Sequence, residues 1–221
     1  TSGVYIGIGI TLLGGGFLID YLTSIGGVTL PIIGYLKPWQ ATFMIVGAPG
    51  LLVSALIFFM HEPERTDRVF GKKEDRSNFE VIEHMKVHKR TLIPMFSGLV
   101  FMAFIFYSFT FWGPTMMVRT FGLSLSEVGF TLGSITIISS LAGTLLAGAM
   151  VDYLRSRGFT DAPVRTAMFS SILALPFIAA APMMENVLAA WVCIAFYLFF
   201  ISTFAPLGLL SISGVCGGNV K

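Results

Sequence analysis

The sequence has 221 residues, of which 55% are hydrophobic and only 12% are charged, and its mean hydropathy is +0.82. Ordinary soluble domains carry roughly a quarter charged residues and just under half apolar ones, so this apolar excess is more than a soluble core of this size can bury. The formal net charge of +2 is too small to suggest nucleic acid as a partner. The composition therefore argues against both a soluble domain and a nucleic-acid-binding protein.

Six stretches are long and apolar enough to cross a lipid bilayer as helices. A hydrocarbon layer of about 30 Å requires about 20 helical residues, because lipid cannot hydrogen-bond to free backbone N–H and C=O groups. The sequence predicts spans over residues 4–22, 41–60, 92–114, 128–151, 165–182 and 187–210. We therefore expect an all-α membrane protein with six transmembrane helices, and the lipid bilayer is its first expected partner.

Glycine is frequent in these spans, and small residues let membrane helices approach one another closely. The strongest cases are "GIGITLLGGG" in the first span and "GSITIISSLAGTLLAG" in the fourth. We expect close helix contacts at these positions. The glycines assigned to helix packing are Gly7, Gly14, Gly15, Gly16 and Gly143.

Lysine and arginine gather in two of the predicted connections, and this sets an orientation because cytoplasmic loops collect these residues. The segment 62–90 holds eight of them, and the turn after Val151 has Arg155, Arg157 and the bordering Arg165. The other three turns have at most one each. This alternation places both ends of the chain and both basic connections on the cytoplasmic side of a cell membrane, and a bacterial inner membrane is the favoured location.

The segment 62–90 is charged in both signs and contains no apolar run, so it is predicted to be a linker between two groups of spans. Ser77 and Glu80 have the spacing of a capping box, which favours a short interfacial helix inside this linker. His84 and His88 lie four residues apart on that helix. A zinc site needs further ligands that the sequence does not suggest, so no metal site is assigned.

The predicted spans carry no group of residues typical of catalysis. No Asp, Glu, Lys or Arg falls at the middle of a span, and the three histidines lie in or beside the linker. Neither an enzymatic activity nor a cofactor is therefore expected. A coupling ion such as H+ or Na+ would have to bind to helices outside this chain.

The stretch "GAMVDYLRSRG" at the end of the fourth span joins a carboxylate to two arginines. Gly148 and Asp152 share a helix face. On this face the glycine lets a neighbouring helix approach closely, and the carboxylate contacts groups of that helix. The positive end of a helix dipole would attract Asp152, while Arg155 and Arg157 would lie at the lipid headgroups. The alternative is that Asp152 simply ends the span in water.

The same stretch resembles the loop signature of the major facilitator superfamily, in which a Gly, three residues and an Asp precede a basic cluster. The glycine usually expected shortly after the Asp is replaced in "YLRSR". "VYIGIGITLLGGGFLID" and "LKPWQATFMIVGAPGLLVSALIFFMHEPER" are similar to the fifth and sixth helices of the spinster-like branch of that superfamily. "FWGPTMMVRTFGLSLSEVG" is similar to the seventh helix and the entry to the eighth.

The resemblance implies a fold of twelve transmembrane helices, of which this chain carries about the fifth to the tenth. Residues 1–61 would be the last two helices of the N-terminal bundle, residues 62–90 the cytoplasmic linker, and residues 91–221 the first four helices of the C-terminal bundle. The chain would then be a fragment, with the missing helices of its parent chain as further partners.

In the family the loop carboxylate docks against a neighbouring helix end and stabilises the outward-facing state. The resemblance therefore implies a gating role for Asp152, with Gly148 and with Arg155 or Arg157 in support. The partner helix would be the eleventh, which this chain lacks.

The expected function is secondary active transport of a small organic or lipid-like solute by alternating access. Asp20, near the end of the first span, is expected to reach headgroup water rather than the solute. Two alternatives are a non-transporting membrane protein, either a lipid-modifying enzyme or a scaffold, and a channel, for which no polar ring is visible. The side chains expected to line the pathway are Tyr107, Thr110, Trp112, Arg119, Tyr197, Ser202 and Thr203.

Overall fold

The computed structural model describes residues 2–31, 34–56, 86–87, 89–203, 206–208 and 210. Within this part of the chain, six helices are long and apolar enough to cross a membrane. They confirm the predicted class of all-α membrane protein. Their bounds are α1 (Ser2–Ser24), α2 (Pro38–Leu56), α4 (Lys89–Phe121), α5 (Leu125–Ser156), α6 (Ala162–Ala180) and α7 (Val187–Ile201), and a short 3-10 helix, η2 (Ala181–Met183), follows α6.

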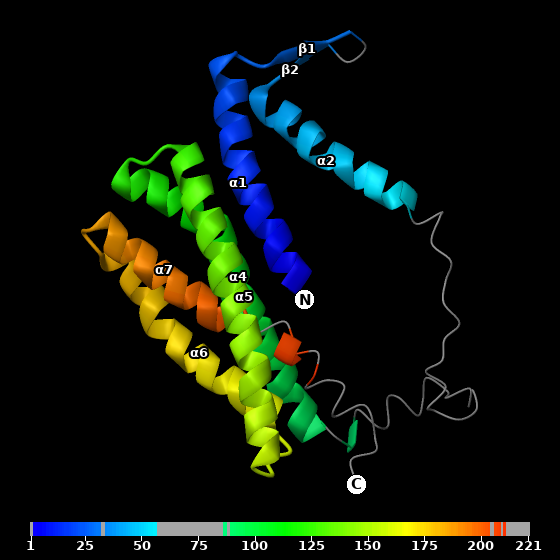
Figure 1. Cartoon of the computed structure of the whole chain (residues 1–221), viewed down its shortest axis with the longest axis vertical. Helices are drawn as coiled ribbons and strands as arrows, with labels where there is room; N and C mark the ends of the chain where they lie inside the picture. Colours follow the sequence, from blue (N-terminus) through cyan, green and yellow to red (C-terminus); the bar gives the residue numbers. More distant parts are fainter. Residues whose placement is uncertain are drawn as a thin grey trace.

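The six helices run alternately up and down, as the predicted spans require (Figure 1). One end of the molecule holds the C-terminal ends of α1, α4 and α6 and the N-terminal ends of α2, α5 and α7. A short antiparallel hairpin of β1 (Val28–Leu30) and β2 (Gly34–Leu36) lies at the same end. We call this end the hairpin end and the other the opposite end.

The hairpin was not predicted from the sequence. It follows α1 because Gly26 and Gly27 both have positive φ angles, of 73° and 102°, which favour glycine. The N–H of Gly27 donates to the carbonyl of Leu22 at 3.0 Å, which closes the last turn of α1. The chain then pairs Val28 with Leu36 and returns into α2.

The main apolar core lies among α4, α5, α6 and α7, where one face of α7 is buried in the bundle. Met117 of α4, Val128 and Leu132 of α5, and Ile194 of α7 belong to this core. Helix α1 packs mainly on α5, although α2 follows it in the sequence. The contact between α1 and α5 therefore joins the two groups of spans that the sequence separates by the charged linker.

Helices α4 and α5 continue furthest past their predicted ends. Helix α4 continues through Pro114 to Phe121, so that Arg119 lies in its last turn rather than in a loop. A proline removes one backbone donor, whereas a helix end within lipid would leave several backbone groups unpaired, so the longer helix is favoured. Helix α5 continues past the predicted end to Ser156, which places Asp152 and Arg155 in its last turns.

The domain division at residues 61/62 and 90/91 stays a prediction. Most of segment 62–90 lies outside the described residues, including the predicted capping box at Ser77 and Glu80 and the pair His84 and His88. At the end of this segment, Lys89 and Arg90 already belong to α4.

Candidate functional site

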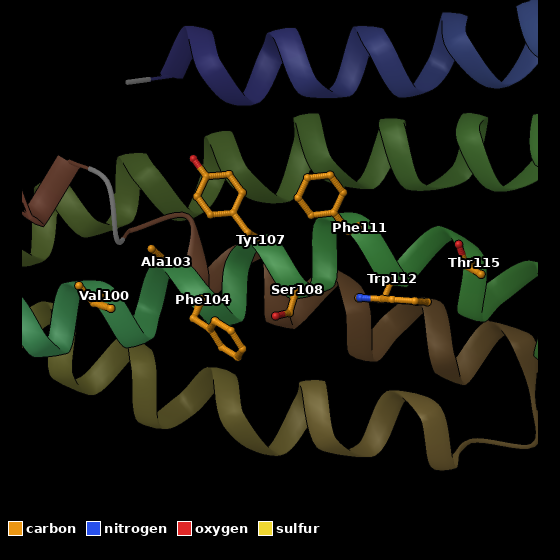
Figure 2. A pocket seen from close by; sticks show the side chains of 8 residues that line it. All are labelled: Val100, Ala103, Phe104, Tyr107, Ser108, Phe111, Trp112 and Thr115. Carbon is orange, nitrogen blue, oxygen red and sulfur yellow. The ribbon is translucent and has the colours of Figure 1, made fainter. Parts of the chain in front are cut away.

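A groove of about 720 Å³ runs along one exposed face of α4 (Figure 2). Its residues recur every three or four positions, which is the spacing of one helix face. Ser108 and Thr115 supply hydroxyl groups, and aromatic rings supply most of the remaining surface. Such a surface can hold an apolar body and offer a few hydrogen bonds. The lining residues are Val100, Ala103, Phe104, Tyr107, Ser108, Phe111, Trp112 and Thr115.

The aromatic rings stand on both sides of this groove. Figure 2 shows Tyr107 and Phe111 on one side, and Phe104 and Trp112 on the other with Ser108 between them. The rings of Phe104 and Trp112 also line a second cavity of about 300 Å³, which reaches η2 and the end of α6. The aromatic face of α4 therefore borders on η2 and the apolar C-terminal end of α6, where Pro182 and Ile178 line the second cavity.

Two predicted pathway residues of α4 lie in the groove and two do not. Tyr107 and Trp112 line it and are 58% and 69% exposed. Thr110 is outside it, and its hydroxyl donates to the carbonyl of Phe106 in the same helix at 2.9 Å. Arg119 is exposed and lies four residues beyond Thr115, so it continues the groove face by one helical turn.

The predicted pathway residues near the end of α7 are buried between helices instead. The ring of Tyr197 packs against Phe109 with centroids 4.9 Å apart, and its hydroxyl donates to the carbonyl of Ile105 at 3.3 Å. Ser202 and Thr203 directly follow α7, and their hydroxyls donate to the carbonyls of Phe199 and Phe200 at the end of that helix. The structure thus places these three residues in helix contacts and apart from the groove.

Glycines form the contact between α1 and α5. A Cβ atom added to Gly16 would lie 2.7 Å from the carbonyl oxygen of Leu125, and one added to Gly129 would lie 2.5 Å from that of Leu12. Gly9 and Gly133 meet in the same way one or two turns along. The backbones of the two helices can therefore approach only because these positions lack side chains.

The predicted packing glycines fall into two groups. Gly16 lies in the contact with α5, and Gly143 faces the carbonyl of Phe199 in α7. By contrast, no atom of the described residues lies within 4 Å of a Cβ added to the other three. The packing role of these three stays a prediction: Gly7, Gly14 and Gly15. Gly9, Gly129 and Gly133 were missed, although a spacing of four residues between two of them marks one helix face.

Asp20 lies at the same contact, near the hairpin end. Its carboxylate accepts a hydrogen bond at 2.9 Å from the backbone N–H of Ser126, in the first turn of α5. The capping box of α5 occupies other donors, because Ser124 and Glu127 each accept from the other's backbone N–H. Asp20 is half-buried. The sequence did not predict this bond, which forms because the glycine contact brings α1 close enough for the carboxylate to reach α5. The expected position in headgroup water stays a prediction.

The signature stretch lies at the opposite end, where all four of its predicted gating residues are exposed: Gly148, Asp152, Arg155 and Arg157. The guanidinium group of Arg157 donates to the hydroxyl of Tyr153 at 2.8 Å. Asp152 has no ion pair among the described residues, and a Cβ atom added to Gly148 would meet none of their atoms within 4 Å. The gating role of these residues stays a prediction.

A glycine closes the turn after the signature, although it comes later than the family pattern expects. Gly158 has a φ angle of 88°, and its N–H donates to the carbonyl of Arg155 at 2.9 Å. The N–H of Phe159 donates to the carbonyl of Leu154 at 3.1 Å. These two bonds form a Schellman motif, which ends α5 sharply.

Comparisons with known proteins identify the family to which the sequence is similar and several relatives. The sequence matches the family profile of the Major Facilitator Superfamily over residues 1–219. The relative named uncharacterized transporter YybO, from Bacillus subtilis (strain 168), is 25% identical over 200 residues, which cover 80% of this chain and 45% of that protein. No solved structure matches.

Two further relatives carry more specific names. The probable galactarate/D-glucarate transporter GarP of Escherichia coli (strain K12) is 27% identical over 155 residues, which cover 59% of this chain and 35% of that protein. Protein spinster of Drosophila melanogaster is 24% identical over 160 residues, which cover 67% of this chain and 26% of that protein. The chain thus spans less than half the length of each of these relatives.

Proposed function

Because the chain belongs to the Major Facilitator Superfamily, as its signature predicted, we propose that it works as part of a secondary transporter. The transporter moves a small organic or lipid-like solute across a cell membrane by alternating access. The observation that carries this proposal is the groove on α4, where hydroxyl groups and aromatic rings share one exposed face of a membrane-spanning helix. The transporter names of the relatives support the same function.

The groove suggests how such a solute is recognised. Its rings pack against an apolar body, and Ser108 and Thr115 form hydrogen bonds with polar groups. Arg119 continues the same face and can pair with a carboxylate or a phosphate. A sugar acid and a lysophospholipid both have an anionic group, and the aromatic lining favours the second.

The remaining parts of the proposal concern orientation and coupling. The basic connections lie in the cytoplasm, and the hairpin end faces outward. Asp152 gates the opposite end by docking on a helix outside this chain when that end is closed. The coupling ion, H+ or Na+, binds to residues that likewise lie outside it.

Exchange of labelled solutes tests this function. The intact protein is reconstituted in proteoliposomes, and exchange of D-glucarate, galactarate and a lysophospholipid is measured. Loss of one hydrogen bond of about 1 kcal/mol lowers apparent affinity about fivefold, so Ser108→Ala reduces exchange by about that factor at low solute concentration. Trp112→Ala removes a wall of the groove and reduces it further.

Phe130→Ala serves as the control, because Phe130 is a similarly exposed ring on α5 that does not line the groove. Its exchange rate should equal that of the unmodified protein. Equal losses in Phe130→Ala and in the two groove variants would contradict a pathway along α4. Absence of exchange for all three solutes would contradict the proposed solute classes.

A further inference from the structure

We propose that Asp20 is a latch that holds α1 on the first turn of α5 and keeps the hairpin end of the transporter closed. The proposal rests on the alternating-access function above, because a latch requires a second state in which the two helices separate. It assigns to Asp20 a role that is distinct from solute binding, since this residue lies outside both cavities of α4.

The hydrogen bond from the N–H of Ser126 to Asp20 joins residues that are 106 positions apart. Their helices belong to the two groups of spans on either side of the charged linker. Motion of one group against the other at the hairpin end must therefore break this bond. A contact of this kind stabilises the closed state and contributes nothing to the open one.

The surroundings of Asp20 make this bond strong. The first turn of a helix presents unpaired N–H groups and the positive end of the helix dipole, both of which favour a carboxylate. The capping box at Ser124 and Glu127 uses neighbouring donors and leaves the N–H of Ser126 for Asp20. Because Asp20 is half-buried, water competes less for its carboxylate than at an exposed site.

Geometry links the latch to the glycine contact. Gly16 lies one helical turn before Asp20, and a Cβ atom added to it would lie 2.7 Å from the carbonyl oxygen of Leu125, the residue before Ser126. A side chain at Gly16 would push the helix ends apart and carry Asp20 away from its donor. The glycines Gly16 and Gly129 allow α1 and α5 to approach closely, and the hydrogen bond of Asp20 stabilises this close contact.

Distances between spin labels at the hairpin end test the latch. The intact protein carries labels at Thr23→Cys of α1 and Thr120→Cys of α4, two exposed sites that lie in different groups of spans. Cys193→Ser, Cys216→Ser and serine at any cysteine of the intact protein outside this sequence remove the native thiols. We expect a short and a long distance, for the closed and open hairpin end. Removing a hydrogen bond to a charged group should shift the ratio of the two populations, open to closed, about tenfold. Asp20→Ala should therefore raise the population with the long distance relative to the short one by that factor.

Asp20→Asn keeps an acceptor but loses the charge, so it should give a smaller shift in the same direction. Asp161→Asn is the matched control, because Asp161 also lies at a helix N-terminus but pairs with Arg165 of its own helix. This variant should leave the ratio unchanged. Size-exclusion elution at the position of the unmodified protein shows which variants remain folded, and Asp20→Asn gives the test if Asp20→Ala does not fold.

The outcomes separate the latch from the function on which it rests. Two distances whose ratio responds to Asp20→Ala, or to Asp20→Asn where the alanine variant does not fold, but not to Asp161→Asn, would support the latch. Two distances with a ratio that the Asp20 variants leave unchanged would overturn it while keeping alternating access. A single distance in the unmodified protein, with and without solute, would overturn alternating access itself.

Discussion

Gly16 of α1 lies directly against Gly129 of α5, so closely that a Cβ atom on either residue would come within 3.2 Å of the other's Cα atom. The hydrophobic effect does not drive helices together inside a bilayer, because lipid tails are as apolar as the side chains. Membrane helices therefore associate through close packing and polar contacts. Here the packing comes from the glycines and the polar contact from Asp20 and Ser126. The α1–α5 contact is therefore the structural element on which the proposed cycle depends.

The first prediction concerns the glycine contact. Gly129→Ala places a methyl group against the backbone of α1, and such overpacking costs about 1–3 kcal/mol. The apparent unfolding temperature of the intact protein in detergent should fall.

Gly14→Ala is the control, because no atom of the described residues lies within 4 Å of the added methyl group. Alanine is the better helix former by about 1 kcal/mol, so this variant should be as stable as the unmodified protein or more so. Equal melting temperatures for the two variants would contradict the close approach at Gly129.

The second prediction concerns a buried hydrogen bond between α1 and the end of α7. Tyr5 is 3% exposed, and its hydroxyl donates to the carbonyl of Ser202 at 2.9 Å. Tyr5→Phe leaves that carbonyl without its donor, which costs about 1–3 kcal/mol in thermal unfolding. Tyr21→Phe alters an exposed tyrosine of the same helix and should have no measurable effect. Equal melting temperatures for Tyr5→Phe and Tyr21→Phe would contradict a stabilising hydrogen bond between Tyr5 and Ser202.

The third prediction concerns the turn after the signature stretch. Gly158 has a φ angle of 88°, which costs a residue with a side chain about 1–2 kcal/mol. Gly158→Ala should therefore lower stability by this amount and loosen the end of α5. Gly148→Ala should not lower stability, because no atom of the described residues lies within 4 Å of a Cβ atom added at this position of α5. A destabilisation of both variants to the same extent would indicate that the turn is not the cause.

The fourth prediction concerns the carboxylate of the signature. Asp152→Asn removes a charge that the proposed gate uses in one of its two states, so solute exchange should slow while insertion and abundance stay near normal. Glu185→Gln, an exposed carboxylate in the turn at the hairpin end, serves as the control and should exchange at the normal rate. Normal exchange by Asp152→Asn would count against the gate.

The sequence predicted the spans well because their length and apolar composition follow from the physics of the bilayer. It predicted the bounds of α5 less well, since the charges at Asp152 and Arg155 suggested an end that the helix passes. The family signature located the stretch around Gly148 and Asp152, and the gating role of these residues stays a prediction.

Contacts between helices were the least predictable feature. The position of Asp20 depends on which face of α1 meets α5, and that choice rests on glycines at both helices. Tyr197 and Trp112 are both aromatic residues in spans, yet one is buried and the other lines the groove. Composition cannot separate them, because helix packing decides which ring faces a neighbour.

The central claim is that α1 and α5 separate at the hairpin end in each transport cycle, and a reversible cross-link tests it most directly. Asp20→Cys and Ser126→Cys, with the native cysteines replaced by serine, introduce one thiol on each of the two residues that the hydrogen bond joins. A second pair, Phe177→Cys and Phe196→Cys, joins α6 to α7 where their rings stack 5.0 Å apart. This pair is the control for cross-linking within one group of spans.

Oxidation of the α1–α5 pair in proteoliposomes should stop solute exchange, and dithiothreitol should restore it, while the α6–α7 pair exchanges at its normal rate in both conditions. Full exchange by protein cross-linked between α1 and α5 would contradict the account.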